Sequence, residues 1–153
     1  MSKELNAATQ TRAAALLNSG DVDGFVDTLF AVDSLDHDPA PDQGPGREGY
    51  RAFFHQLVTA FPDAHLEPVA EVADEDTIAF AYTLTGTHRG DFETTPATGK
   101  KIEIRGLQIG RFENGQIVER WGASDQLGIM QQIGAAPSGG GQGLLSKVTT
   151  ALS

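Results

Sequence analysis

The stretch TIAFAYTLTGTH, residues 77–88, alternates large apolar side chains with small or polar ones, as a β-strand with one buried face does. Residues 101–112 continue the same pattern after a loop. Asn114-Gly115 follows, a pair typical of a type I′ hairpin turn because both residues tolerate a positive φ. Residues 117–125 then form the return strand, so the C-terminal half is predicted to be an antiparallel sheet. The buried face of its first strand carries Ile78, Phe80, Tyr82 and Leu84.

Three amphipathic helices are predicted before these strands. Residues 5–17 carry apolar side chains along one helical stripe, and Asp21 is suited to cap a second helix that runs to Phe30. The third helix, residues 48–61, has the strongest apolar stripe and ends before Pro62, because proline disfavours a helical conformation in the preceding residue. Helices followed by antiparallel strands predict an α+β fold in which a curved sheet packs around the third helix.

Three shorter segments complete the predicted fold. A short extended segment is expected at residues 34–38. A further strand is expected at residues 65–73, where Pro68 indicates a sheet edge or a bulge because proline cannot donate to the ladder. Residues 126–133 are expected to form a short helical turn that ends at Gly134.

The length of 153 residues predicts one domain, with residues 1–136 as the folded part and residues 137–153 as a Gly-rich linker and tail. Residues 144–152 could form a short helix or remain a disordered terminus. The chain has no cysteine, which excludes disulfides, thiolate catalysis and cysteine-based zinc sites. It shows neither a signal-peptide pattern nor an apolar run of membrane-spanning length, so we expect a cytoplasmic protein.

The charge and the short motifs narrow the function classes further. The net charge is −10 and only 11 scattered lysines and arginines are present, so neither nucleic acid nor an anionic membrane surface is an expected partner. The sequence contains no H-x-H or H-E-x-x-H spacing and no G-x-S-x-G elbow, and no G-x-G-x-x-G follows a strand. We therefore expect no metal, no cofactor and no nucleophilic serine.

Five segments along the chain have a distinctive order and spacing. They are DHDP (36–39), AFPD (60–63), GTHRGDFETTPATGK (86–100), NGQIVERW (114–121) followed by Asp125, and QQIG (131–134). Together they resemble the SnoaL-like polyketide cyclases of the NTF2-like superfamily. The resemblance implies a cone-shaped α+β barrel whose cavity opens between helices and sheet, and a homodimer or homotetramer packed sheet to sheet. It also implies a small hydrophobic or aromatic, polyketide-like substrate.

Asp125 is the first candidate for chemistry. Pairing across the hairpin turn places Asp125 opposite Ile104 and Trp121 opposite Gln108, with Asp125 and Trp121 on one face. A carboxylate on an apolar face has a raised pKa, as an acid/base group near neutral pH requires. The alternative is that the strand has ended and Asp125 caps the following turn. The resemblance implies that the acid/base carboxylate of these cyclases stands at position 125.

Two histidines are the other catalytic candidates. His88 ends the strand on its buried face, where it could hydrogen-bond a substrate carbonyl or, alternatively, bond to the backbone as a structural residue. His37 lies in the short extended segment and could face either the pocket or solvent. The expected substrate-binding side chains, the aromatic ones forming flat apolar walls, are Trp121, Gln108, Phe54, Tyr82 and Ile104.

The function that the resemblance implies is a cofactor-independent intramolecular aldol condensation. Asp125 would move the proton, while His88 and His37 would stabilise the developing oxyanion. A second hypothesis is hydrolysis or hydroxylation, because relatives with this fold open epoxides with a water held by a carboxylate and an arginine. Arg105 is the nearest arginine, but the predicted register puts it on the face opposite Asp125. A third hypothesis is a non-catalytic protein that binds a small molecule.

Overall fold

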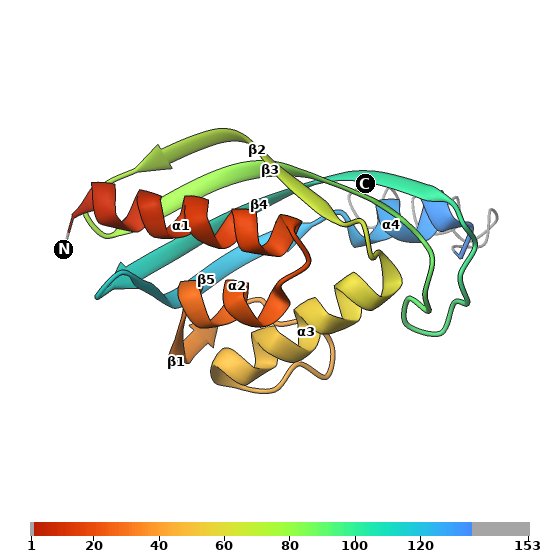
Figure 1. Ribbon diagram of the computed structural model, residues 1–153, viewed down its shortest axis with the longest axis horizontal. Helices are drawn as coiled ribbons and strands as arrows, with labels where there is room; N and C mark the ends of the chain where they lie inside the picture. Colours follow the sequence, from red (N-terminus) through yellow and green to blue (C-terminus); the bar gives the residue numbers. More distant parts are fainter. Residues whose placement is uncertain (1, 136–153) are drawn as a thin grey trace, which may run out of the picture.

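The computed structural model describes residues 2–135, which form four helices on a five-stranded sheet (Figure 1). The helices are α1 (Lys3–Asn18), α2 (Val22–Leu29), α3 (Gly46–Ala60) and α4 (Gln126–Ile133). The strands are β1 (Phe30–Asp36), β2 (His65–Ala73), β3 (Thr77–Thr87), β4 (Lys101–Glu113) and β5 (Gln116–Ser124). The predicted α+β class is confirmed. The linker and tail expected at 137–153, including the helix considered at 144–152, lie outside the described residues.

The sheet has the strand order β1-β5-β4-β3-β2, so β1 and β2 are its two edges and the sheet is not closed. β1 runs parallel to β5, and every other neighbouring pair is antiparallel. Pro68 predicted a sheet edge or a bulge, and both are present. β2 is an edge strand, and its register shifts between Pro68 and Ala70. The three N-terminal helices lie on one face of the sheet (Figure 1).

The helix ends follow the predicted capping pattern. The Asp21 carboxylate accepts a hydrogen bond of 2.8 Å from the Gly24 backbone N–H and so caps α2. The second helix ends one residue earlier than expected, since Phe30 has extended backbone angles and begins β1. Its ring stacks on Tyr50 of α3 with centroids 3.8 Å apart, a contact worth about 1 kcal/mol beyond burial. This contact, distant in sequence, holds Phe30 in the strand.

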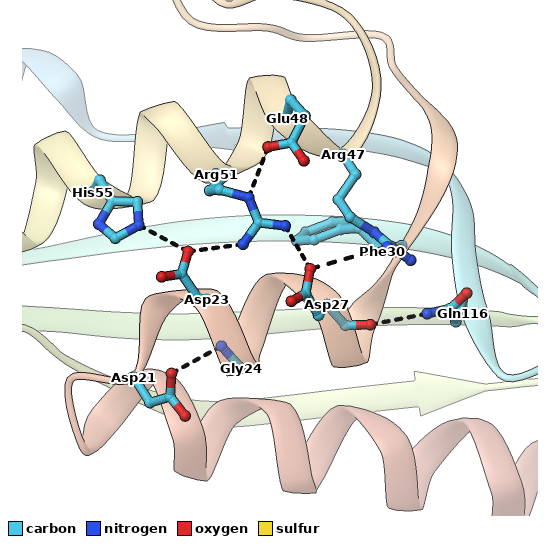
Figure 2. A network of polar contacts seen from close by, with 10 residues as sticks. All are labelled: Asp21, Asp23, Gly24, Asp27, Phe30, Arg47, Glu48, Arg51, His55 and Gln116. Atoms are coloured by element: carbon cyan, nitrogen blue, oxygen red, sulfur yellow. Dashed lines mark hydrogen bonds and ion pairs between the residues drawn. The ribbon is translucent and has the colours of Figure 1, made fainter.

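A polar network fastens α2 to α3 at the surface (Figure 2). Arg51 of α3 donates to Asp23 and to Glu48 at 2.7 Å each, and also pairs with Asp27. His55 contacts Asp23 at 3.0 Å. The hydrogen bonds from His55 and Arg51 lower the pKa of Asp23, and the carboxylates, Glu48 first, raise the pKa of Arg51. The network therefore fixes α3, which carries one wall of the cavity described below, against α2.

The hairpin between β4 and β5 differs from the predicted register. Asn114 and Gly115 both have positive φ, 51° and 78°, as expected for the turn. Phe112 pairs with Ile117 but Arg111 pairs with Glu119, so Val118 is an extra residue in β5. A β-bulge of this kind reverses the facing of every later residue in the strand. The predicted pairing of Trp121 with Gln108, and of Asp125 with Ile104, is therefore wrong.

The corrected register pairs Trp121 with Ile109 and Gln108 with Gly122. Arg120 pairs with Gly110 and takes the concave, helix-covered face of the sheet, which a regular hairpin would have assigned to Trp121.

Among residues 2–135, no helix is long and apolar enough to cross a membrane.

A candidate active-site pocket

A cavity of about 1030 Å³ lies between the helices and the concave face of the sheet. Such a volume is large enough for a multi-ring organic molecule. Its walls are largely apolar, with aromatic rings from α3 and β3 on facing sides. Side chains that form these walls include Phe25, Phe54, Leu57, Phe80, Tyr82 and Ile129.

Arg120 is the basic group at the centre of the polar part of this cavity. Its Nε donates to Gln108 Oε1 at 2.9 Å, and its Nη1 donates to Asp36 Oδ1 at 2.9 Å. The side chain is 18% exposed and that of Asp36 only 8%. The guanidinium lies over Gly122, where an added Cβ would come within 2.6 Å of Nη2. The missing side chain at position 122 thus provides the space that Arg120 occupies.

Asp36, the partner of Arg120, has hydrogen bonds on both carboxylate oxygens. Oδ1 also accepts from the Asp38 backbone N–H at 3.0 Å, and Oδ2 accepts from Gln43 Nε2 at 3.0 Å. A buried ion pair needs such additional hydrogen bonds to offset the desolvation of its charges. The pair is therefore a fixed feature of the cavity wall, with its Arg120 side turned toward the pocket.

Two tyrosines face this cluster. Burial raises the pKa of Tyr50 to about 12, and burial also raises the pKa of Tyr82. The ring of Tyr82 lies across Gly106, where any side chain would overlap it. Both phenols are consequently protonated at neutral pH, so they can donate hydrogen bonds but cannot act as bases.

Three of the predicted substrate-binding residues line the cavity together: Phe54, Tyr82 and Gln108. Ile104 is buried, with 3% exposure, in the hydrophobic core beside Tyr82 and Ile129 rather than in the cavity wall. Trp121 is on the opposite, outer face of the sheet because of the bulge at Val118. Its ring stacks on His37 with centroids 4.7 Å apart.

Neither predicted catalytic histidine lines the cavity. His37 is on the outer face, where Nε2 contacts Glu119 at 2.9 Å. His88 is fully buried, and its Nδ1 accepts from the Thr98 backbone N–H at 3.2 Å and contacts Thr98 Oγ1 at 2.9 Å. His88 also bonds through its backbone to Lys100 and Gly99. The structural alternative for His88 fits this placement, because the residue closes the base of the loop that follows β3.

Asp125 lies at the rim of the cavity and not on an apolar inner face. The residue is exposed, and its Oδ1 accepts from the Gly128 backbone N–H at 2.8 Å as the N-cap of α4. The predicted burial is therefore wrong, because β5 ends at Ser124 and the chain turns into a helix. Its two neighbours, Ser124 and Gln126, do line the cavity.

The sequence analysis missed Arg120 and Asp36 because both depend on the bulge and on the β1–β5 pairing. Asp36 pairs with Arg120 in that parallel register, 84 positions apart in the chain. The available signal was the lack of a side chain at Gly122, two positions after Arg120 and therefore on the same face of the strand. Within residues 2–135, no three histidine, aspartate or glutamate side chains are grouped as metal ligands would be.

The family model and the solved structures that match this chain indicate the same family. A model of the SnoaL-like polyketide cyclases matches residues 7–133. The chain is similar to IdmH, a candidate polyketide cyclase from Streptomyces antibioticus, at 30% identity and a TM-score of 0.71, covering 84% of this chain and 98% of that one. No significant match was found among curated proteins.

Two further solved structures are similar over nearly their whole length. AclR, a candidate hydroxylase from Streptomyces galilaeus, has 25% identity and a TM-score of 0.78, covering 89% of this chain and 100% of that one. TsrD from Streptomyces laurentii has 24% identity and a TM-score of 0.79, covering 88% of this chain and 98% of that one. At this identity the likeness to TsrD concerns the fold alone.

The ionisation of Tyr50 and Tyr82 tests whether both phenol groups are buried as described. The chain contains only two tyrosines, and both have a raised pKa in the folded state. Burying the two protonated phenols therefore adds to the free energy of unfolding. For Tyr50 this contribution is fully present below the ordinary tyrosine pKa of 10.0 and is lost as pH rises toward about 12. We therefore predict that phenolate absorbance appears only together with the loss of native circular dichroism. An ionisation near pH 10 in protein that is still folded would contradict the placement of one of the rings.

Proposed function

Because this chain belongs to the SnoaL-like polyketide cyclase family, we propose that it closes a ring in a polyketide-like substrate by intramolecular aldol condensation in the cavity. The observation that carries this proposal is the Arg120 guanidinium in an apolar, aromatic cavity of sufficient size. The proposed reaction needs no cofactor, since a carbon between two carbonyls is already acidic and its enolate is delocalised.

The proposed reaction moves one proton and forms one carbon–carbon bond. A base removes the proton from the acidic carbon, and the resulting enolate carbon attacks a ketone carbon of the same molecule. The ketone π electrons pass to its oxygen, which takes up a proton to give the hydroxyl group. The cavity contributes by folding a flexible substrate so that the two carbons meet, a positional effect that can supply about 7–11 kcal/mol.

Arg120 is proposed to hold the oxygen on which negative charge develops. Two of its three nitrogens already bond to Gln108 and Asp36, which fixes the plane of the guanidinium. Nη2 has no hydrogen bond to protein atoms of residues 2–135, so its N–H groups remain available to a ligand. A preorganised donor of this kind stabilises the transition state more than the ground state. Arg120 thus takes the role predicted for His88 and His37.

Asp125 is proposed as the acid/base group, now at the rim of the cavity. Its Oδ1 is engaged by Gly128, whereas Oδ2 has no partner among the described residues and is free to accept a proton. Asp36, by contrast, has hydrogen bonds on both oxygens. Ser124 and Gln126 line the cavity on either side of Asp125, whereas Asp125 itself does not, so the proposal requires a substrate that extends past these two residues to the carboxylate.

A second candidate function is the addition of water to a strained ring such as an epoxide. The observation that favours it is the Asp36–Arg120 pair at 2.9 Å, which joins a carboxylate to an arginine that lines the cavity. Asp36 would take a proton from a water whose oxygen attacks the ring carbon. The carbon–oxygen bond would break toward the ring oxygen, which would then be protonated. The likeness to AclR, a candidate hydroxylase, is compatible with water or oxygen chemistry in this fold.

We also propose that the protein is a homodimer or homotetramer that packs through the outer face of its sheet. Val72, Ile109 and Trp121 lie in one row across this face, and Leu107 stands beside them. Val72 is 72% exposed and Leu107 62%. An apolar surface of this kind on one face of a sheet is typical of an interface.

The catalytic proposal is tested by comparing Asp125→Asn with Asp21→Asn. Both aspartates cap a helix by accepting from a glycine N–H three residues later, and asparagine caps equally well, so both variants should fold. With an aromatic 1,3-diketone that carries a third ketone within reach, Asp125→Asn should reduce ring closure at least ~100-fold while the ligand still binds. Asp21→Asn should retain full turnover. Unchanged ring closure in Asp125→Asn would end the assignment of the base.

Mass spectrometry of the products separates the two candidate functions. Aldol closure leaves the mass unchanged or removes one water, whereas ring hydrolysis adds one water. An epoxide of the same aromatic skeleton that gains water, with loss of that activity in Asp36→Asn, would favour the second function. Tight binding of both ligands without any product would contradict an enzymatic role altogether.

Light scattering tests the proposed assembly. Leu107→Lys should shift the wild-type mass toward the monomer, because it places a charge in the centre of the apolar outer face. Leu5→Lys is the matched control, since Leu5 is also an exposed leucine, at 44%, but lies on α1. A wild-type protein that is monomeric at every concentration would contradict the interface.

A further inference from the structure

The cavity extends into a slot between α1 and the edge strand β2. α1 runs antiparallel to β2 and is attached at both ends by asparagine side chains. Asn6 Nδ2 donates to Glu75 O at 3.2 Å, and Asn18 exchanges two hydrogen bonds with Leu66, at 3.1 and 2.9 Å. Between these attachments, Gln10 from α1 and Glu71 from β2 line the cavity.

Gln10 carries an unused hydrogen-bond acceptor in this slot. The residue is only 9% exposed, and its Oε1 is buried without a hydrogen-bond partner among the described residues. Leaving a buried polar atom unpaired costs roughly 1–3 kcal/mol, so such atoms are rare unless a ligand or water completes them. Asn6 Oδ1 and His88 Nε2 are the other buried side-chain atoms without a partner in residues 2–135, and of the three residues only Gln10 lines the cavity, where a ligand could supply the missing donor.

Glu71 offers a second acceptor in the cavity lining, an exposed carboxylate at an inward-facing position of β2. The inward-facing positions of β2 before it are Leu66 and Pro68, which pair with Leu84 and Tyr82 of β3. After the bulge, Glu71 pairs with Phe80 and takes the same inward face. No ion-pair partner of Glu71 exists within residues 2–135. Glu67 also lines the cavity, but it pairs with Thr83 at an outward-facing position of β2, and its carboxylate contacts His65 at 3.0 Å.

The strand register places Glu71 in one row with the polar cluster. Glu71 pairs with Phe80, and Phe80 pairs with Gln108, which holds Arg120. Two strand spacings separate Glu71 from Gln108, a distance of about 10 Å. An aromatic ring on Phe80 could therefore have a carbonyl oxygen at Arg120 and a substituent at Glu71.

We propose that Gln10 and Glu71 form a subsite for a protonated amino group carried by the substrate. Both groups are acceptors, one of them is anionic, and the lining residues that α1 and β2 supply include neither lysine nor arginine. A carboxylate or phosphate on the ligand would be repelled there, in a chain whose net charge is already −10. The inference rests on the cavity being the substrate site, as proposed above, and it specifies one end of the substrate.

Calorimetry with three matched naphthalene ligands tests this subsite without any turnover. The ligands carry an aminoethyl, a hydroxyethyl or a carboxymethyl group on the same ring. Because hydrogen bonds to charged groups contribute about 1.5–3 kcal/mol, the amine should bind roughly tenfold more tightly than the alcohol, and the carboxylate most weakly. Glu71→Gln should bring the amine within about twofold of the alcohol, and Gln10→Leu should weaken the same preference.

Glu103→Gln is the control, and it should leave the preference intact because Glu103 is exposed at an outward-facing position of β4 and does not line the cavity. Equal binding of amine and alcohol by the wild-type protein would overturn the subsite while leaving the aldol proposal standing. Equal loss of the preference in Glu103→Gln and Glu71→Gln would also overturn it, because the effect would then be one of general charge. Failure of all three ligands to bind would contradict the cavity as a binding site, and with it the proposed function.

Discussion

The extra residue Val118 in β5 is the constraint on which the rest of the site depends. A strand alternates faces, so one inserted residue exchanges the inward and outward sets for the remainder of its length. Arg120 thereby enters the cavity and meets Asp36, while Trp121 moves to the outer face and stacks on His37. A regular hairpin with the same sequence would place the Trp121 indole on the concave face and the Arg120 guanidinium on the outer face.

The fold was predictable because its signals are local. Apolar periodicity gave the helices and strands, Asp21 and Asn114-Gly115 gave a cap and a turn, and Pro68 marked the edge strand. Phe30 was assigned to the second helix instead of β1. Its strand conformation is supported by a contact with Tyr50, 20 positions away, and the apolar periodicity of neighbouring residues carries no information about such a contact. The site was less predictable for the same reason. Phe54, Tyr82 and Gln108 line the cavity, yet the side chains after the bulge all face the other way.

The polar cluster also explains why two glycines stand on the concave face. Gly106 leaves room for the ring of Tyr82, and Gly122 leaves room for the guanidinium of Arg120. A buried ion pair adds little net stability compared with apolar packing, whereas removing one partner is costly. Arg120 and Asp36 are therefore better explained by what they do to a guest in the cavity than by stabilisation of the fold. The apolar walls and the acceptors at the α1 end then define the guest's shape and orientation.

An NMR titration with an uncharged naphthalene ligand tests the facing of β5 directly. The chain has one tryptophan, so the Trp121 indole N–H gives a single signal, and the Nε–H signal of Arg120 can be assigned by its loss in Arg120→Lys. Our account predicts that the Arg120 signal shifts in proportion to ligand occupancy while the indole signal stays in place. A shifting indole beside an unmoved Arg120 signal would mean that the regular register holds, and would contradict the site described above.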